Sequence, residues 1–142
     1  MNNCDVVVTG GLGFIGSSIV NSCIDDNKVT IIDDSSSGTI KNINNPNHKN
    51  LDIIEANLND LDLNNVLKGK DYIFHLAAMS NVAWSIDEPE RCMNNNVSST
   101  EKLINASIEA GIKKIIFSSS SSIYGDNLNL PLYCNLFCLY MH

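Results

Sequence analysis

The feature that most constrains the fold of this chain is a run of valines that leads directly into closely spaced glycines, in the stretch VVVTGGLGFIGSSIV at residues 6–20. The β-branched run over residues 5–9 predicts a strand that is buried on both faces, as in a parallel sheet. After the glycines, apolar residues recur at helical spacing from Phe14 to Ile24. The stretch therefore predicts a strand, a tight glycine turn and a helix in immediate succession.

Strand-like and helix-like patterns alternate along the rest of the chain. Apolar runs predict further strands over residues 29–33, 51–56, 71–78 and 113–118. Periodic apolar residues predict a short helix that ends at Gly69 and a longer helix from about Pro89 to Ala110, which Gly111 ends. The polar stretch 35–50 is expected to be a loop with at most one short helix. Such alternation predicts an α/β fold, a Rossmann-type doubly wound parallel sheet truncated after about the fifth strand.

The glycines of the turn have a spacing that suits phosphate binding. Gly10, Gly13 and Gly16 form the pattern GxxGxxG, and Gly11 adds the overlapping pattern GxGxxG. Such a turn lets a strand pass sharply into a helix, lets a pyrophosphate approach the backbone, and lets the helix pack closely on the strand. The helix N-terminus then offers N–H donors to the phosphates. A purely structural turn is the alternative, but a strand before the glycines and a helix after them favour a dinucleotide site.

An acidic residue ends the next predicted strand. Asp33, followed by Asp34, stands where a carboxylate accepts both hydroxyls of an adenosine ribose. The same charge repels the additional phosphate of NADP, and the loop that follows contains no arginine. A turn acid is the alternative interpretation. The residues therefore predict NAD(H) as the cofactor, in preference to NADP(H).

Composition excludes several other classes of protein. The chain has 142 residues, which predicts one domain, and its net charge of −7 argues against a nucleic-acid partner. Its apolar runs are too short for a membrane span and its N-terminus resembles no signal or transit peptide, so we expect a cytoplasmic protein. Its five cysteines are scattered without metal-ligand spacing, so no metal site is expected. His75 lies mid-strand among apolar residues and is expected to be a core histidine.

Five motifs occur in order and at consistent intervals: VTGGLGFIGS, IIDDSSSG, FHLAAMSNVAWSIDEP, NNNVSST and FSSSSSIYGD. As a set they resemble the N-terminal half of the extended short-chain dehydrogenases/reductases. The resemblance is to the NAD-dependent nucleotide-sugar epimerases and dehydratases, and to UDP-hexose 4-epimerases in particular. It covers about residues 4–130. It implies a domain that binds NAD and a nucleotide-sugar substrate, a UDP-hexose.

The resemblance implies a role for each matched position. The positions implied to contact the cofactor are Gly10, Gly13, Phe14, Ile15 and Gly16 at the pyrophosphate, Asp33, Asp34, Ser35 and Gly38 at the adenosine ribose, Asn57 and Leu58 at the adenine, and Ala77, Ala78, Asn96 and Ser118 toward the nicotinamide. Family members usually carry Asp at the position of Asn57, but an amide oxygen can accept the same hydrogen bond. Ser80 and Asn81 would border the substrate.

The resemblance also assigns a role to the serines after the fifth predicted strand. In the family a hydroxyl residue there binds the reacting sugar oxygen, and the match places this catalytic and substrate-binding group at Ser120. A tyrosine and a lysine in a Tyr-x-x-x-Lys motif complete the site. Dehydratases and decarboxylases of the family carry acidic residues where this chain has Ser121 and Ser122. The resemblance therefore favours a 4-epimerase, which oxidises C4 of the sugar, rotates the ketosugar and returns the hydride to the other face.

No Tyr-x-x-x-Lys occurs in the printed sequence. We expect an NAD-binding domain over residues 1–131 and an atypical apolar tail over residues 132–142 that arises from truncation or a frameshift. We therefore expect this chain to lack epimerase activity. The alternatives are a non-catalytic NAD(H)-binding fragment and another extended short-chain sugar reductase or dehydratase. The homodimer usual in the family is in doubt for this chain, because the helix with the tyrosine and lysine is missing.

Overall fold

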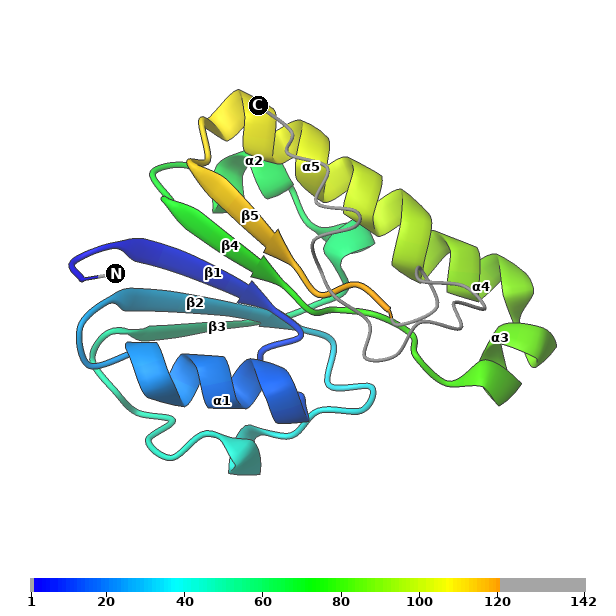
Figure 1. Ribbon diagram of the computed structural model, residues 1–142, viewed down its shortest axis with the longest axis horizontal. Coiled ribbons are helices and arrows are strands. Elements are labelled where there is room, and N and C mark those ends of the chain that lie inside the picture. The colour runs from blue at the N-terminus through cyan, green and yellow to red at the C-terminus, as the bar shows by residue number, and fades with distance from the viewer. Residues whose placement is uncertain (1, 121–142) are drawn as a thin grey trace, which may run out of the picture.

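The computed structural model describes residues 2–120, which form one parallel five-stranded sheet in the order β3-β2-β1-β4-β5 (Figure 1). The strands are β1 (Asp5–Thr9), β2 (Lys28–Asp33), β3 (Leu51–Glu55), β4 (Tyr72–His75) and β5 (Lys114–Phe117). Val6 of β1 lies opposite Val29 of β2 and Tyr72 of β4. The strand order reverses at β1, as in a Rossmann-type sheet, so the predicted fold class is confirmed.

Helices cover both faces of the sheet. The helix α1 (Phe14–Cys23) lies on one face, and α2 (Leu63–Val66) and α5 (Ser99–Ala110) lie on the other (Figure 1). The remaining helical segments are η1 (Ile40–Asn42), η2 (Leu58–Asp60), α3 (Val82–Asp87), α4 (Pro89–Met93) and the π-helical turn η3 (Asn94–Ser98). The segments α4, η3 and α5 follow one another directly, so the long helix predicted from Pro89 is present but contains a π-helical turn.

Alternate residues of β1 divide the core into two halves. Val6 and Val8 pack with Val20 of α1 on one face. Val7 packs with Leu63 of α2 and Leu103 of α5 on the other face. The three valines have no solvent exposure, which is the burial on both faces that the valine run predicted. Each buried valine side chain stabilises the fold by about 1.5–3 kcal/mol.

The structure changes several predicted boundaries. The strand predicted over residues 71–78 ends at His75: the Leu76 amide still reaches the backbone oxygen of Thr9 at the end of β1, but the Ala77 amide donates to the Thr9 side chain instead. The helix α3 was not predicted, and it begins where the Asn81 side chain accepts a hydrogen bond from the Trp84 amide. The short helix expected before Gly69 is divided into η2 and α2. Gly69 and Gly111 have φ values of 74° and 71°, which confirms that each allows the chain to turn after a helix.

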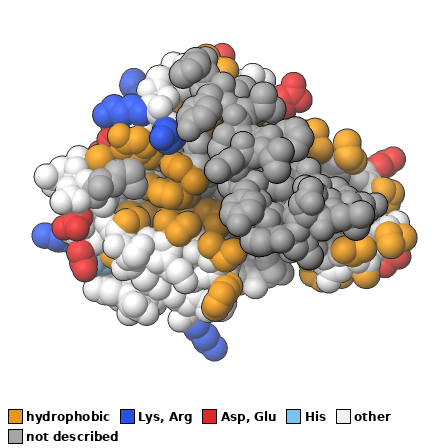
Figure 2. All heavy atoms as spheres, viewed as in Figure 1, with side chains coloured by type: hydrophobic (Ala, Val, Ile, Leu, Met, Phe, Trp, Pro, Cys, Tyr) orange, Lys and Arg blue, Asp and Glu red, His pale blue; other side chains and the backbone are white. Residues whose placement is uncertain are grey.

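Hydrophobic side chains gather over β4 and β5 on the face that carries α1 (Figure 2). Phe74 of β4 is half-buried, and Ile116, its partner in register on β5, is 38% exposed. These side chains form an apolar surface on β4 and β5, and the tail at residues 132–142 lies outside the described residues. Within residues 2–120, no helix has the length and apolar character that a membrane crossing requires.

Candidate functional site

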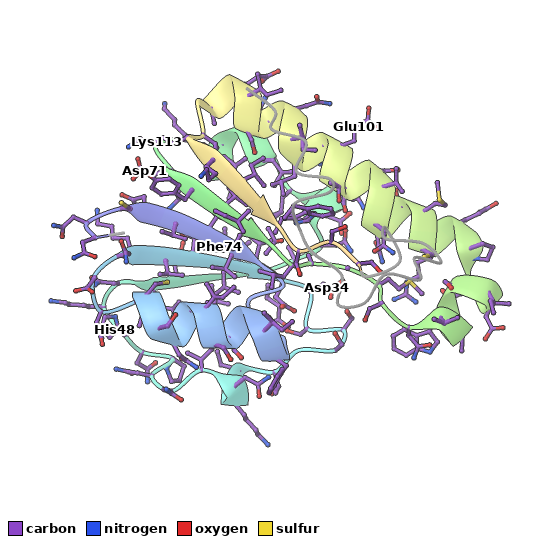
Figure 3. The ribbon with its side chains drawn as sticks, in the orientation of Figure 1. Asp34, His48, Asp71, Phe74, Glu101 and Lys113 are labelled. Carbon is purple, nitrogen blue, oxygen red and sulfur yellow. The ribbon has the colours of Figure 1, made fainter. Side chains whose placement is uncertain are left out.

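A cavity of about 620 Å³ opens at the carboxyl ends of the strands. Loops from neighbouring strands diverge at this edge of an open α/β sheet, which is why ligands bind there. The wall combines the glycine turn, the loops after β2, β3 and β4, and two serines after β5. Figure 3 shows Asp34 at this end of the sheet, whereas the ion pair between Lys113 and Asp71, at 2.7 Å, lies at the opposite end.

In the glycine turn, Gly10 and Gly16 are required by close packing, whereas Gly13 leaves open space beside the cavity. Gly10 has a φ of 69°, and a Cβ there would lie 2.7 Å from the amide nitrogen of Ala77. A Cβ at Gly16 would collide with the carbonyl oxygen of Gly10. At Gly13, by contrast, a Cβ meets only that same oxygen, at 3.3 Å, and Gly13 lines the cavity. The protein therefore leaves room beside Gly13, which fits a pyrophosphate that approaches the N-terminus of α1.

Asp33, at the end of β2, connects that strand to the glycine turn. Its Oδ2 atom accepts a hydrogen bond from the Leu12 amide at 2.9 Å, and its Oδ1 atom accepts one from the Ser35 amide at 2.9 Å. The side chain is largely buried, and it lines the cavity. A carboxylate has about four acceptor positions, so each oxygen can still accept one ribose hydroxyl. The geometry thus fits the ribose-binding role that the sequence predicted.

Asp34 is held by its own loop and by the loop after β3. Its Oδ1 atom accepts from the Ser36 amide at 3.0 Å, and its Oδ2 atom accepts from the Asn57 side-chain amide at 3.2 Å. Partial burial would raise the pKa of Asp34, but these hydrogen bonds and the positive charge of Arg91 outweigh it and hold the pKa below its usual range. Asp34 therefore adds a second negative charge beside Asp33 on the cavity wall.

The side chain of Asn57 links the loop after β3 to the π-helical turn. Besides Asp34, its Nδ2 atom donates to Oδ1 of Asn95 at 3.2 Å. Its Oδ1 atom accepts from the Asn59 amide at 3.0 Å, which caps η2. Each Asn57 side-chain atom thus has a protein partner, and Oδ1 retains one lone pair for an adenine amino group.

The loop after β4 forms the opposite end of the wall. The side chain of Asn96 holds this loop at Met79, accepting from the backbone N–H at 2.7 Å and donating to the backbone carbonyl at 3.1 Å. Ala77 and Ala78 line the cavity beside Met79. Small side chains at these positions leave space for a ligand, as the resemblance implied for the nicotinamide side.

His75 is a core histidine, as the sequence predicted. It is 1% exposed, and burial lowers its pKa to about 4. Its Nδ1 atom lies 2.7 Å from the Thr9 hydroxyl, and its Nε2 atom lies 2.9 Å from the Thr100 hydroxyl. Its ring stacks on Phe117, with ring centroids 5.4 Å apart. Within residues 2–120, no cluster of potential metal ligands was found.

The structure brings most of the predicted site residues to one wall: Gly10, Gly13, Phe14, Ile15, Gly16, Asp33, Asp34, Asn57, Leu58, Ala77, Ala78, Ser80, Asn81 and Ser118. Four others lie off the wall. Ser35 donates its amide to Asp33, Gly38 packs behind the glycine turn, and Asn96 acts through Met79. Ser120 is exposed, two residues beyond Ser118. Ser121 and Ser122 lie outside the described residues.

Sequence reasoning missed several residues on the wall, among them Trp84, Arg91, Asn95 and Ser99. These four come from α3 and from the segment that α4, η3 and α5 form. The prediction against NADP noted that no arginine follows Asp33, but Arg91 reaches the cavity from a helix far along the chain. The only signal in the sequence was that Arg91 and Asn95 are four residues apart, on one face of a predicted helix.

Comparison with known protein families decides the assignment. The family model described as the NAD dependent epimerase/dehydratase family matches residues 6–135. The chain belongs to this family. The glycine turn, Asp33 and the loop after β4 all lie within the matched span, so the resemblance seen in the sequence is confirmed, as is NAD as the cofactor of the family.

Individual members of the NAD-dependent epimerase/dehydratase family agree with this assignment. The UDP-glucose 4-epimerase of Mycolicibacterium smegmatis is 37% identical over 124 residues, which cover 84% of this chain and 40% of that protein. A solved UDP-N-acetylglucosamine 4-epimerase from Methanobrevibacter ruminantium, in complex with UDP-N-acetylmuramic acid, is 58% identical with a TM-score of 0.90 and covers 94% of this chain and 43% of that one. A UDP-glucose 4-epimerase from Stenotrophomonas maltophila, solved with NAD and a formylated UDP-arabinopyranose, is 26% identical with a TM-score of 0.80, over 92% and 41% of the two chains. The chain thus spans about 40% of the length of the curated relative.

Proposed function

We propose that this chain is the NAD-binding part of a UDP-sugar 4-epimerase. One observation carries the proposal. The open side of Gly13 and the carboxylate of Asp33 face the same cavity, at the carboxyl ends of the parallel strands. This arrangement offers a site for a pyrophosphate and a site for a ribose diol within one cavity. The similarity to UDP-sugar 4-epimerases supports the reaction.

Each part of the cavity wall suits one part of NAD. The glycine turn and the first amides of α1 would hold the pyrophosphate, and Asp33 would hold the adenosine ribose. Asp33 and Asp34 place two carboxylates near the single cation, Arg91, among the described residues that line the cavity. The resulting negative charge disfavours the extra phosphate of NADP. When bound, NAD supplies the transient oxidation at C4 of the sugar.

The serines after β5 would meet the sugar. Ser118 and Ser119 line the cavity, and Ser80 faces it from the loop after β4. We assign Ser120 to the hydroxyl that orients the reacting sugar oxygen, as the family resemblance implies. Ser121 and Ser122, which argue against a dehydratase, fall beyond the described residues.

Proton removal from the sugar hydroxyl has no assigned group in the printed sequence. In the family, by the resemblance above, a Tyr-x-x-x-Lys motif performs this step, and the printed sequence does not contain it. The loss of such a general base lowers the rate by at least ~10²–10⁴-fold. We therefore infer that the 142-residue chain binds NAD without catalysing epimerisation by itself.

We propose a UDP-N-acetylhexosamine as the substrate of the whole protein. Identity is 58% to the UDP-N-acetylglucosamine 4-epimerase and 37% to the UDP-glucose 4-epimerase of Mycolicibacterium smegmatis, over similar shares of this chain. The higher identity favours the N-acetylated sugar.

Calorimetric titration and a sugar assay on the purified chain test these proposals. We expect NAD and ADP-ribose to bind, and NADP to bind at least ~10-fold more weakly. We expect no interconversion of UDP-N-acetylglucosamine and UDP-N-acetylgalactosamine. If ADP-ribose does not bind, the cofactor assignment is wrong for this chain. If the sugars interconvert, the inference of inactivity is wrong.

A further inference from the structure

We infer that His75 is a positioning residue. Together with Thr9 and Thr100 it forms a directed chain of hydrogen bonds, the Thr9–His75–Thr100 relay, that fixes the loop at residues 76–79 against the glycine turn. That this loop faces NAD rests on the proposed function, whereas the relay itself rests only on the contacts described next.

The direction of the relay follows from the Thr100 end. The Thr100 hydroxyl lies 2.7 Å from the carbonyl oxygen of Asn96, and a carbonyl only accepts, so this hydroxyl donates its single proton there. Thr100 can then only accept from His75, whose Nε2 must carry a hydrogen. The buried ring is neutral, so Nδ1 carries no hydrogen and must accept. The Thr9 hydroxyl therefore donates to Nδ1 of His75, at 2.7 Å.

The Thr9 end agrees independently with this direction. The Thr9 hydroxyl oxygen lies 3.2 Å from the backbone nitrogens of both Leu76 and Ala77, and the Leu76 N–H is shared with the backbone oxygen of Thr9 at 3.1 Å. These N–H groups can only donate, so the Thr9 oxygen accepts from them and keeps its own proton for His75. Each side chain of the relay thus accepts a hydrogen bond from one neighbour and donates one to the next, from the amide of Ala77 to the carbonyl of Asn96.

The two ends of the relay hold one loop at two points. At one end, Thr9 binds the amide of Ala77, the residue whose nitrogen lies too close to Gly10 to admit a Cβ there. At the other end, Thr100 binds the carbonyl of Asn96, whose side chain makes the two backbone hydrogen bonds to Met79. His75 spans the distance between these anchors. The loop between Ala77 and Met79 therefore takes its position from β1 and from the π-helical turn together.

A nitrogen-15 NMR measurement on the whole chain tests the direction of the relay without any ligand. The signals of His75 are assigned by their loss in His75→Gln. At pH 7 we expect a neutral ring with hydrogen on Nε2 and none on Nδ1. A hydrogen on Nδ1, or a doubly protonated ring, would overturn the inference.

Amide hydrogen exchange tests the positioning role. Each substitution is made at one end of the relay, and exchange is measured at the loop residue held by the other end. In Thr9→Val we expect the Met79 amide to exchange at least ~10-fold faster relative to the amide of Val7, which lies in the core. In Thr100→Val we expect the Ala77 amide to exchange at least ~10-fold faster relative to the Val7 amide. Thr30→Val is the matched control, since it removes a buried hydroxyl that binds Lys70 and takes no part in the relay. If the Ala77 and Met79 amides exchange as fast in Thr30→Val as in the relay variants, relative to the Val7 amide, the inference is contradicted.

Conservative variants separate the hydroxyl from the packing around it. Thr9→Ser and Thr100→Ser retain the hydroxyl and lose a methyl group, so we expect exchange at Ala77 and Met79 to return toward the wild-type rate. If the serine variants exchange as fast as the valine variants, packing explains the effect and the relay does not hold the loop. The tautomer of the unsubstituted chain decides the question if a valine variant fails to fold. Lack of NADH binding would refute the proposed function without changing these outcomes.

Discussion

The carboxylate of Asp33 is hydrogen-bonded to the glycine turn: its Oδ2 atom accepts from the Leu12 amide at 2.9 Å. The same side chain lines the cavity, so one residue both orders the turn and presents acceptors to a ligand. This hydrogen bond therefore fixes the proposed ribose site relative to the proposed pyrophosphate site without a ligand. This preorganisation reduces the entropy that binding must overcome.

Substitution of Asp33→Asn should weaken NAD binding without unfolding the chain. The amide keeps one acceptor oxygen, but it loses the charge that strengthens hydrogen bonds to a ribose diol, which contribute about 1.5–3 kcal/mol when an ion takes part. We expect NAD affinity, measured by calorimetry, to fall by ~10–100-fold. Asp52→Asn, on an exposed position of β3, should leave the affinity unchanged. Wild-type affinity in Asp33→Asn would show that this carboxylate does not bind the ribose.

Substitution of Asp34→Asn should narrow the preference for NAD over NADP. The hydrogen bonds and Arg91 that hold the pKa of Asp34 low keep it charged at neutral pH, and its charge opposes a phosphate nearby. With that charge removed, Arg91 is left to attract the 2′-phosphate. We expect the ratio of NADP to NAD dissociation constants to fall by ~10-fold, corresponding to about 1.4 kcal/mol. An unchanged ratio would mean that Asp34 does not face the adenosine ribose.

Alanine at two glycines of the turn should give two different defects. Gly16→Ala forces a Cβ against the Gly10 carbonyl oxygen and should lower the free energy of unfolding by about 1–3 kcal/mol or more. Gly13→Ala meets only one atom of the protein and should fold with nearly wild-type stability, yet lose NAD binding, because the methyl group fills the space left for the phosphates. Urea unfolding and NAD titration of both variants measure this. Strong NAD binding by a folded Gly13→Ala chain would contradict the assigned phosphate site.

Protonation of His75 should destabilise the fold in acid. Burial lowers its pKa from 6.5 to about 4, so the unfolded chain binds this proton more readily than the folded chain. The loss of stability should begin as the pH falls below about 6.5 and be complete below about 4, reaching about 3 kcal/mol. Urea unfolding across this range should show the slope in the wild type, but a reduced slope in His75→Asn. Equal slopes in the two proteins would mean that His75 titrates normally in the folded state.

The parts of this structure that sequence reasoning predicted are those with local causes. The valine run and the glycines of residues 6–20 define β1, the turn and the start of α1 through steric constraints on neighbouring residues alone. The acidic residue at the end of β2 was recognisable for the same reason, since its place depends on the strand that carries it.

The parts that were missed depend on contacts between distant segments. Arg91 reaches the cavity only because η3, which directly follows α4, packs against the loop after β3, where Asn57 binds Asn95. The π-helical turn follows from packing of Asn94, Asn95 and Asn96 against two loops, and no local pattern distinguishes these residues from other asparagines of an asparagine-rich chain. Their roles became visible only in three dimensions.

The most direct test of the NAD assignment uses Trp84, the only tryptophan of the chain, which lines the cavity. Titration of the purified chain with NADH, with excitation of the tryptophan, reports energy transfer to the reduced nicotinamide at short range. The account predicts saturable quenching of Trp84 with emission from NADH, and loss of both in Gly13→Ala. A wild-type chain that is folded by circular dichroism and shows neither signal at millimolar NADH would contradict it.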